Sequence, residues 1–187
     1  MRSRACPREP AAVPGQGRRP DGAGAPRPRA VRVNLALERA DQADIMALID
    51  ALDAYQKPLY PPQSHHGIDV AELLRPNVLF AVAREPDAAG TAGMAVGCAA
   101  VVLGPRYGEL KRMFVLPASR GRGIGAALLV FLERAARSEG CRRLMLETGV
   151  LQREALTLYE RTGFRRCEPF GDYRPDPLSA FMYKDLD

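Results

Sequence analysis

The sequence predicts a single domain of mixed α/β class, in which about four helices flank a central, mostly antiparallel sheet of about six or seven strands. Three observations predict this class. Strand-like and helix-like segments alternate from residue 31 onwards, two adjacent strand-like segments have the pattern of an antiparallel hairpin, and a glycine-rich turn leads from an apolar strand into a helix. At 187 residues, 47% of them hydrophobic, the chain is long enough for one sizeable core.

The first half of the domain is predicted to hold a strand, two helices and a β-hairpin. The expected elements are a strand over 31–37, helices over 41–55 and 69–74, and hairpin strands over 78–84 and 94–103. Apolar and polar residues alternate over the first strand, whereas apolar residues recur at helical spacing in the first helix. Asp41 is the expected N-cap of that helix, and Pro76 ends the second helix.

The second half is predicted to continue with single strands and two longer helices. The expected elements are strands over 108–116, 143–147, 164–167 and 180–184, and helices over 124–138 and 152–162. Gly140 and Gly163 end the two helices. The inner face expected for the helix over 124–138 comprises Ala127, Leu128, Phe131, Leu132 and Ala135.

Residues 1–30 form a tail that we expect to be disordered. They hold six prolines, four glycines and almost no large apolar side chains, so they cannot bury enough surface to offset their ordering entropy. Seven arginines against Glu9 and Asp21 place the whole net charge of +5 in this tail. Residues 31–187 are therefore neutral, and the basic balance is no argument for nucleic-acid binding.

Cysteine, histidine and hydropathy patterns exclude several classes of protein. The four cysteines lie far apart without metal-ligand spacing, which indicates reduced thiols in a cytoplasmic protein. The only histidines are His65 and His66, which argues against a His-based zinc site or a Ser-His-Asp triad, so no metal is expected. No run of 18 apolar residues occurs, so no membrane partner is expected.

The most informative segment is the turn over 120–125, which reads Arg-Gly-Arg-Gly-Ile-Gly. Its three glycines leave backbone N–H groups bare, and the N-terminus of the following helix adds about half a positive charge from its dipole. Such a turn is suited to bind an anion such as a pyrophosphate. The segment therefore predicts a nucleotide-type cofactor.

A dinucleotide-binding fold is the main rival interpretation of this turn. Residues 121–126 satisfy the G-x-G-x-x-A pattern, and Glu147 ends the next strand about where a ribose-binding acid belongs. However, residues 117–120 separate the turn from its strand, and only 40 residues follow Glu147, too few for the rest of a doubly wound sheet. The Lys-Ser/Thr pair of NTPase phosphate loops is also missing. The turn therefore fits a different cofactor fold better.

Two motifs at the right separation resemble the GNAT superfamily of acetyl-CoA-dependent N-acetyltransferases. The motifs are Arg120-x-x-Gly123-x-Gly125 after a strand ending in Val115-x-Pro117, and Ala155-x-x-Leu158-Tyr159-x-x-x-Gly163-Phe164 in the later helix. The resemblance covers about residues 31–187. It implies the GNAT fold for this domain, with acetyl-CoA as the co-substrate.

The resemblance implies which residues hold acetyl-CoA. Backbone N–H groups at a splay or bulge of one strand would bind the pantetheine arm, and the glycine turn would bind the pyrophosphate. These residues are Met113, Phe114 and Val115 in the strand, and Arg120, Gly121, Arg122, Gly123, Ile124 and Gly125 in the turn. The two arginines either add charge or lie on a solvated surface. Gln152 stands where many members place a cofactor-contacting Asn, or it is only a helix N-terminal residue.

The resemblance also implies the catalytic groups. Tyr159 occupies the family's tyrosine position and would protonate the CoA thiolate, since a phenol with a pKa of about 10 is a competent donor; the alternative is that it only packs against the cofactor. Glu109 stands where some members place a general base, or it forms an ion pair with Lys111 or Arg112. Glu147 is the second candidate, as the base or as an anchor for the substrate ammonium group.

The acceptor pocket of this family usually lies at the loop between the first two helices. Ser64 and His66 there, with His65, offer hydrogen bonds and a titratable group, although an exposed histidine pair is the plainer interpretation. The segment over 169–177 either walls this site or is only a rigid turn. We therefore expect an N-acetyltransferase that acts on a small primary amine by direct attack, since no cysteine is placed to carry the acetyl group.

Two other functions stay open. A protein or peptide N-acetyltransferase would need an open groove, which the segments over 58–62 and 169–177 would obstruct. A non-catalytic acyl-CoA-binding regulatory module would bind acetyl-CoA without transfer, but the presence of Glu109 and Tyr159 argues for an enzyme. Whether the chain forms a homodimer also stays open.

Overall fold

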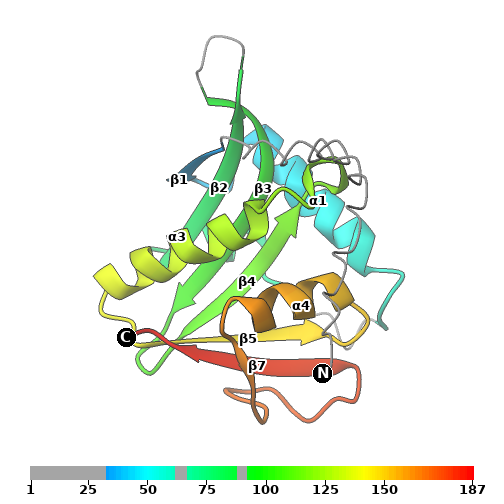
Figure 1. Ribbon diagram of the computed structural model, residues 1–187, viewed down its shortest axis with the longest axis vertical. Helices are drawn as coiled ribbons and strands as arrows, with labels where there is room; N and C mark the ends of the chain where they lie inside the picture. The colour runs from blue at the N-terminus through cyan, green and yellow to red at the C-terminus, as the bar shows by residue number, and fades with distance from the viewer. Residues whose placement is uncertain (1–32, 62–66, 88–91) are drawn as a thin grey trace, which may run out of the picture.

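The computed structural model describes residues 33–61, 67–87 and 92–187 (Figure 1). The tail over 1–30, expected to be disordered, and the acceptor candidates Ser64 and His66 lie outside these residues. In the described part of the chain, seven strands form one sheet in the order β1-β2-β3-β4-β5-β7-β6, and four α-helices accompany it. The predicted class, a mixed α/β domain with a mostly antiparallel sheet, is confirmed.

The elements follow the predicted order. The chain begins with β1 (Asn34–Leu37), α1 (Ala43–Gln56), α2 (Val70–Leu73) and the hairpin strands β2 (Val78–Pro86) and β3 (Ala92–Leu103). It continues with β4 (Gly108–Val115), a short 3₁₀ turn (Pro117–Ser119), α3 (Ile124–Ser138) and β5 (Arg143–Gly149). The last elements are α4 (Arg153–Arg161), β6 (Arg165–Arg166) and β7 (Ser179–Asp185).

One parallel contact interrupts the antiparallel sheet. β4 and β5 run parallel because α3 connects them as a crossover, whereas the other neighbouring strands pair antiparallel. The β4–β5 register covers only Gly108–Leu110 against Leu144–Leu146. Beyond that stretch the two strands diverge (Figure 1). The divergence leaves peptide groups of β4 without a sheet partner on one side.

The helices cover both faces of the sheet. Side chains alternate along β2, so that Phe80 and Val82 pack with α1 and α2, while Ala81 and Ala83 pack with α3 on the opposite face. The second of these cores extends to α4 through Tyr159. Both cores include residues of β4, so this strand lies between the two helix layers.

The predicted N-cap of α1 is wrong. Gln42 is the N-cap residue, and no side chain caps this helix end. Asp41 instead accepts hydrogen bonds from Arg39, at 3.1 Å from Nε and 2.6 Å from Nη2. A guanidinium two residues away thus takes the carboxylate that would otherwise cap the helix, a competition that spacing alone does not reveal.

The predicted inner face of α3 is partly right. Leu128 and Leu132 are fully buried as expected, but Leu129 and Ala136 are fully buried as well, whereas Phe131 is only partly buried. Ala127 and Ala135 are also only partly buried. The stripe covered by the sheet is therefore rotated by about one residue relative to the prediction, because α3 crosses a twisted sheet rather than a flat surface.

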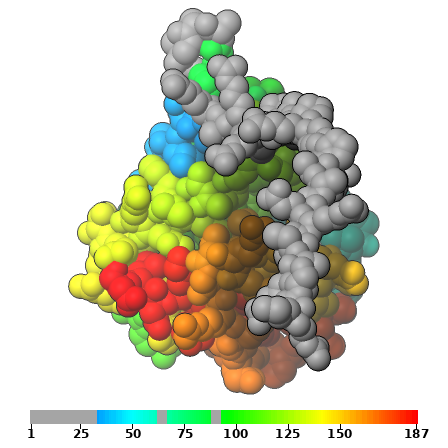
Figure 2. All heavy atoms as spheres, viewed as in Figure 1, coloured from blue at the N-terminus to red at the C-terminus, as the bar shows by residue number. Residues whose placement is uncertain are grey.

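Two charged side chains, Lys184 and Arg84, connect elements that surround the middle of the sheet. On the face shown in Figure 2, α3, α4 and the C-terminal end of β7 lie side by side. Lys184 of β7 joins the two helices, because its Nζ donates to Glu133 Oε1 at 2.6 Å and to the carbonyl of Thr162 at 2.8 Å. This contact holds α3 and α4 together on one side of the sheet.

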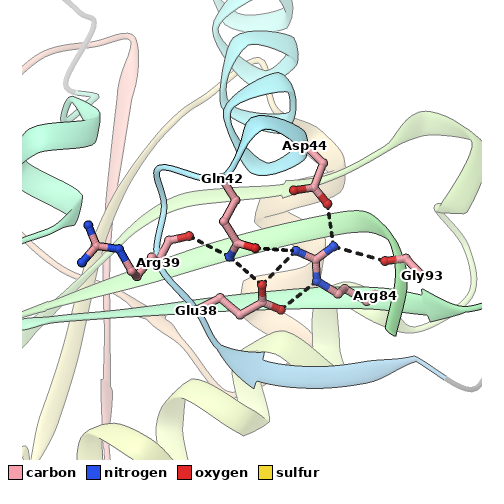
Figure 3. Close-up of polar contacts among 6 residues, drawn as sticks. All are labelled: Glu38, Arg39, Gln42, Asp44, Arg84 and Gly93. Atoms are coloured by element: carbon pink, nitrogen blue, oxygen red, sulfur yellow. Dashed lines mark hydrogen bonds and ion pairs between the residues drawn. The ribbon is translucent and has the colours of Figure 1, made fainter. Parts of the chain in front are cut away.

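Arg84 of β2 is the second of these side chains, and it links the end of β1 to the start of α1 (Figure 3). Its guanidinium donates to Glu38 twice at 2.8 Å, to Asp44 at 2.5 Å, to the carbonyl of Gly93 at 3.1 Å and to Gln42 at 3.4 Å. Hydrogen bonds from Arg84 hold the pKa of Glu38 and of Asp44 below their ordinary values. All five N–H donors of this arginine are used.

Candidate functional site

The site begins where β4 leaves β5, and a β-bulge marks the place. Opposite β3, Cys98 faces Phe114 and Ala100 faces Lys111, so β4 holds one residue more than β3 over this stretch. Arg112 sits in the bulge with a φ of 54°, a left-handed conformation that is strained for a side chain other than glycine. The bulge turns part of the β4 backbone away from the ladder.

Arg112 itself is held from both sides. Its Nε donates to the carbonyl of Ile68 at 2.8 Å, and its guanidinium forms an ion pair with Asp53 of α1. The thiol of Cys98 donates to the carbonyl of Arg112 at 3.5 Å, and burial raises the pKa of this thiol to about 12. The strained backbone is therefore fixed by contacts with α1, with Ile68 and with Cys98 of β3.

Past the bulge, the peptide groups of Val115 face the gap. Leu116 N donates to the carbonyl of Val96 at 2.9 Å, so the peptide groups of Val115 point to the opposite side of β4. There the carbonyl of Val115 accepts a hydrogen bond from Arg120 Nε at 3.1 Å. The backbone near Val115 is thus free of the sheet, as the predicted pantetheine contact requires.

The glycine turn is open where an anion would bind. Gly121 and Gly123 have φ values of 73° and 81°, and apart from their chain neighbours no heavy atom of the described residues lies within 4 Å of the position that a Cβ would take at either glycine. Within the described residues, none of the N–H groups over 121–126 donates to a backbone carbonyl. Gly125 has a different role, because a Cβ there would lie 2.9 Å from Leu158 of α4.

These features line a cleft of about 630 Å³ between the end of β4, the glycine turn and α4. Its predicted cofactor residues are Met113, Phe114, Val115, Arg120, Gly121, Gly123, Gly125 and Gln152. Two further predicted residues do not line it. Ile124 is buried in the core of α3, and the guanidinium of Arg122 forms an ion pair with Glu85 of β2. We call this cleft the donor cleft.

A smaller cavity of about 270 Å³ lies in the split between β4 and β5, and we call it the central cavity. It shares Leu52, Met113 and Gln152 with the donor cleft, so the two spaces are neighbours. Tyr159 and Glu147 both line it, although they come from α4 and β5. The structure thus brings together the predicted acid and one of the two predicted carboxylates.

The environments of these two residues differ. Tyr159 is only 5% exposed, and burial raises the pKa of its phenol, to which the negative charge of Glu147 adds. The phenol is therefore neutral over the physiological range and is able to donate a proton. Glu147 accepts a hydrogen bond from Ser179 Oγ at 2.6 Å, across the β5–β7 pair.

A third space of about 780 Å³, which we call the outer cavity, adjoins the central cavity. The two share Gly67, Lys111 and Leu178, so the three spaces form a continuous series from the glycine turn outward. The segment over 171–178 lines the outer cavity. Glu109 also faces this outer space, but it does not line the central cavity.

Glu109 belongs to a compact polar cluster. Its Oε1 lies 2.8 Å from Lys111 Nζ and accepts a hydrogen bond from Tyr173 OH at 2.6 Å, and Lys111 also donates to that hydroxyl. Burial and then the hydrogen bond to Glu109 raise the pKa of Tyr173. The ion pair with Lys111, one of the two predicted interpretations of Glu109, is therefore present.

Sequence reasoning missed Tyr60, which closes the inner end of the site. Its ring packs against Gly149, where a Cβ would lie 2.0 Å from the ring. Its hydroxyl accepts from Leu151 N at 3.0 Å and interacts with Gln152, the N-cap residue of α4. Tyr173 was also missed as a member of the cluster, whereas Lys111 was expected only as one possible ion-pair partner of Glu109. No local pattern marks Tyr60 or Tyr173, because their partners lie far away in the sequence.

The described residues show no other obvious kind of site. Within 33–61, 67–87 and 92–187, no His, Cys, Asp and Glu side chains gather in threes around a possible metal position. No helix in these ranges has both the length and the apolar character needed to cross a membrane.

The sequence and the fold match known acetyltransferases. Residues 46–164 match the acetyltransferase (GNAT) family. The chain is 44% identical over 156 residues to a protein of Azospirillum brasilense named IAA acetyltransferase, covering 82% of this chain and 98% of that protein. It is 37% identical to YsnE of Bacillus subtilis, an N-acetyltransferase whose name gives no substrate, covering 67% and 82% of the two chains.

Solved structures give the same picture. A Klebsiella pneumoniae protein assigned as an acyl-CoA N-acyltransferase matches with a TM-score of 0.70 at 38% identity, covering 84% of this chain and 99% of that chain. An aminoglycoside 6'-N-acetyltransferase solved with coenzyme A shares the fold, with a TM-score of 0.61 at 16% identity, over 82% of this chain and 97% of that chain.

Proposed function

The chain belongs to the GNAT family of acetyltransferases, and from this premise we propose that it transfers the acetyl group of acetyl-CoA directly to the primary amine of a small molecule. Members of this family are acyltransferases that use acetyl-CoA. The observation that carries the proposal is the series of three spaces. The donor cleft, the central cavity and the outer cavity share lining residues pairwise, so a donor and an acceptor would meet in the middle.

The donor cleft fits the chemistry of acetyl-CoA. The N–H groups over 121–126, which donate to no backbone carbonyl among the described residues, and the N-terminus of α3 suit a pyrophosphate, and the Val115 N–H, which points away from β3, suits the amide-rich pantetheine arm. Arg120 lines the cleft and would add positive charge there, although it also pairs with the exposed Glu154 at 3.3 Å, whereas Arg122 lies outside the cleft and pairs with Glu85. We therefore assign the charge contribution to Arg120 and leave Arg122 as a surface residue.

Tyr159 is the proposed general acid. It is buried in the central cavity next to the donor cleft, and its raised pKa keeps the proton on the phenol until a thiolate forms. Catalysis requires no acyl-enzyme, because the described cysteines do not line the central cavity. The acceptor amine then attacks the thioester carbonyl, and the phenol of Tyr159 protonates the leaving thiolate.

Glu147 is the better supported base for an incoming amine. It lines the same cavity as Tyr159, and Ser179 orients its carboxylate, whereas Glu109 faces the outer cavity and is paired with Lys111 and Tyr173. The outer cavity would hold the rest of the acceptor. Its volume of about 780 Å³ falls within the range of small-molecule sites, roughly 300–1,000 Å³.

The test is a screen of small amines and peptides with acetyl-CoA, with release of free CoA thiol as the readout. We expect thiol release with at least one small amine, and Tyr159→Phe to lower its kcat by roughly 100-fold with little change in CoA binding. Tyr183→Phe is the matched control, since Tyr183 lines none of the three spaces. Tight CoA binding without thiol release from any amine would instead favour a non-catalytic acyl-CoA-binding module.

A further inference from the structure

Lys111 occupies an unusual position in the series of spaces. The paired stretch of β4 ends at Leu110, so Lys111 is the first residue beyond the point where β4 and β5 separate. It lines both the central cavity and the outer cavity. Its side chain is 13% exposed, so it lies inside the molecule rather than on a solvated face. An acceptor amine that enters from the outer cavity would have to arrive at this place.

The surroundings of Lys111 resemble those of a bound substrate amine. Its Nζ lies 2.8 Å from Glu109 Oε1, within proton-transfer distance of a carboxylate that is a candidate general base. The same nitrogen contacts the hydroxyl of Tyr173 and lies 5.1 Å from the centre of that ring. A carboxylate, a phenol oxygen and an aromatic face together are the groups that recognise an ammonium ion.

We propose that Lys111 is a self-acetylation site, with its own Nζ as the acceptor when no small amine is present. This inference rests on the proposed function, because it needs acetyl-CoA in the donor cleft. It assigns the two carboxylates to different amines. Glu147 serves the incoming acceptor in the central cavity, and Glu109 serves the internal amine of Lys111.

The transfer balances as follows in atoms and protons. The ammonium of Lys111 gives one proton to Glu109, which releases it to solvent, and the neutral amine forms the N–C bond to the acetyl carbonyl. The C–S bond of the thioester breaks, and Tyr159 protonates the CoA thiolate. The second proton that leaves the nitrogen restores the phenol of Tyr159. The products are an acetamide on Lys111, free CoA and one proton.

The modification changes the charge of the outer cavity. An acetamide carries no charge, so it does not form the present ion pair with Glu109. The carboxylate of Glu109 and the hydroxyl of Tyr173 then face the outer cavity without the lysine charge between them. Self-acetylation therefore makes this cavity more negative, which favours a cationic acceptor.

The chain provides its own reference lysines. It contains 24 arginines but only three lysines, Lys57, Lys111 and Lys184. Lys57 is exposed and also lines the central cavity, so it reports chemical acetylation by acetyl-CoA in the same region. Lys184 is held by a glutamate at 2.6 Å but lines none of the three spaces, so it reports the effect of an ion pair alone.

The experiment incubates the full chain with acetyl-CoA in the absence of any amine and follows acetylation of each lysine by peptide mass spectrometry. We expect Lys111 to react at least tenfold faster than Lys57 and Lys184, with a rate constant that does not depend on protein concentration. Glu109→Gln and Tyr159→Phe should each slow Lys111 at least tenfold and leave Lys57 and Lys184 unchanged. Equal rates at all three lysines would overturn the proposal.

A second measurement does not depend on the donor cleft. Free acetic anhydride reaches lysines without the enzyme's donor site, and the ion pair with Glu109 shields the ammonium of Lys111. Glu109→Gln should therefore increase labelling of Lys111 by acetic anhydride severalfold, the opposite of its effect with acetyl-CoA. Effects of the same sign with both reagents would contradict a base role for Glu109.

Calorimetric titration with CoA separates this inference from the proposed function. If CoA binds and a small amine is acetylated while Lys111 stays unmodified, the self-acetylation proposal alone is wrong. If CoA does not bind, the proposed function fails first. Lys111→Arg keeps a cation beside Glu109 and should give a chain that binds CoA but gains no acetyl group at this position.

Discussion

Arg84 and Lys111 are two cations packed against carboxylates in the same sheet, yet they have different tasks. Arg84 uses all its donors on Glu38, Gln42, Asp44 and the carbonyl of Gly93, and it lines none of the three spaces (Figure 3). Lys111 is held by Glu109 and Tyr173, and it borders two of those spaces. One cluster joins secondary-structure elements, whereas the other borders the proposed acceptor site.

The difference between Arg84 and Lys111 shows that the type of cation, arginine or lysine, matters as much as its burial. A guanidinium stays charged and presents a rigid fork of donors, which suits a permanent link between β1, β2 and α1. An ammonium group on a flexible chain can lose a proton and become a nucleophile. In a chain with 24 arginines, the lysine at the split of the sheet therefore supports the chemical role that we propose for Lys111.

The largest expected effect is on the structural cluster. Arg84→Met should lower the free energy of unfolding by about 2 to 3 kcal/mol, because it leaves the mostly buried Glu38 without its partner. The melting temperature should fall by about 4 to 12 °C, while kcat of the folded fraction stays the same. Arg143→Met is the matched control, since the Arg143–Asp185 pair is about half exposed and should contribute less than about 1 kcal/mol. A large fall in kcat of Arg84→Met would contradict a purely structural role for Arg84.

The second prediction concerns the pH dependence of the difference in unfolding free energy between wild type and Arg84→Met. Arg84 depresses the pKa of Glu38 and Asp44 below their ordinary values of 4.5 and 3.8. Stability from a depressed carboxyl pKa is fully present above the unfolded value and is lost as the pH falls through the folded value. The gap in unfolding free energy between wild type and Arg84→Met should therefore be constant above about pH 5 and narrow below pH 4.5. A gap that widens on acidification would contradict this origin.

The third prediction concerns the cluster at the outer cavity. Tyr173→Phe removes the hydroxyl that bridges Glu109 and Lys111, but it keeps the aromatic ring. We expect KM for the amine acceptor to rise about fivefold, the equivalent of one hydrogen bond of about 1 kcal/mol, with KM for acetyl-CoA unchanged. Steady-state kinetics with each substrate varied in turn measure both values. If only KM for acetyl-CoA changes, the outer cavity is not the acceptor site.

The smallest expected effect concerns the two arginines of the glycine turn, Arg120 and Arg122. Arg120 lines the donor cleft, whereas Arg122 pairs with Glu85 outside it. Arg120→Gln should therefore raise the Kd for CoA about threefold to fivefold, since one partly screened charge contributes on the order of 1 kcal/mol, and Arg122→Gln should leave it unchanged. Titration calorimetry of the two variants decides this. Equal losses would mean that both arginines only contribute long-range charge.

Much of the fold could be predicted from the sequence because its signals are local. The helix α3 begins and ends where the apolar period and the glycines place it, at Ile124 and before Gly140, whose φ of 81° explains the choice of residue. The antiparallel hairpin of β2 and β3 follows from two apolar runs around a turn. The errors arose where distant or competing partners acted, as when Arg39 took the carboxylate of Asp41.

The candidate site was predictable only in part, for the same reason. Apart from Gln152, the predicted donor residues sit on one continuous segment, from β4 to α3, and their spacing is visible in the chain. The central and outer cavities instead combine residues from α1, β4, β5, α4 and the segment before β7. The sequence offered Glu109 as the first candidate for the base and Glu147 as the second, but it could not say which cavity each of them faces.

The order of the elements, the glycine turn before α3 and the position of Tyr159 on α4 follow from the sequence, because each depends on backbone conformation or helical period over a few residues. Only the tertiary structure decided that β4 and β5 separate after Leu110, and that Glu147 meets Tyr159 in the split. It also decided that Tyr173 joins Glu109 and Lys111. The separation of β4 from β5 and the contact of Tyr173 with Glu109 depend on register and on segments distant in the sequence, which sheet pairing and packing bring together.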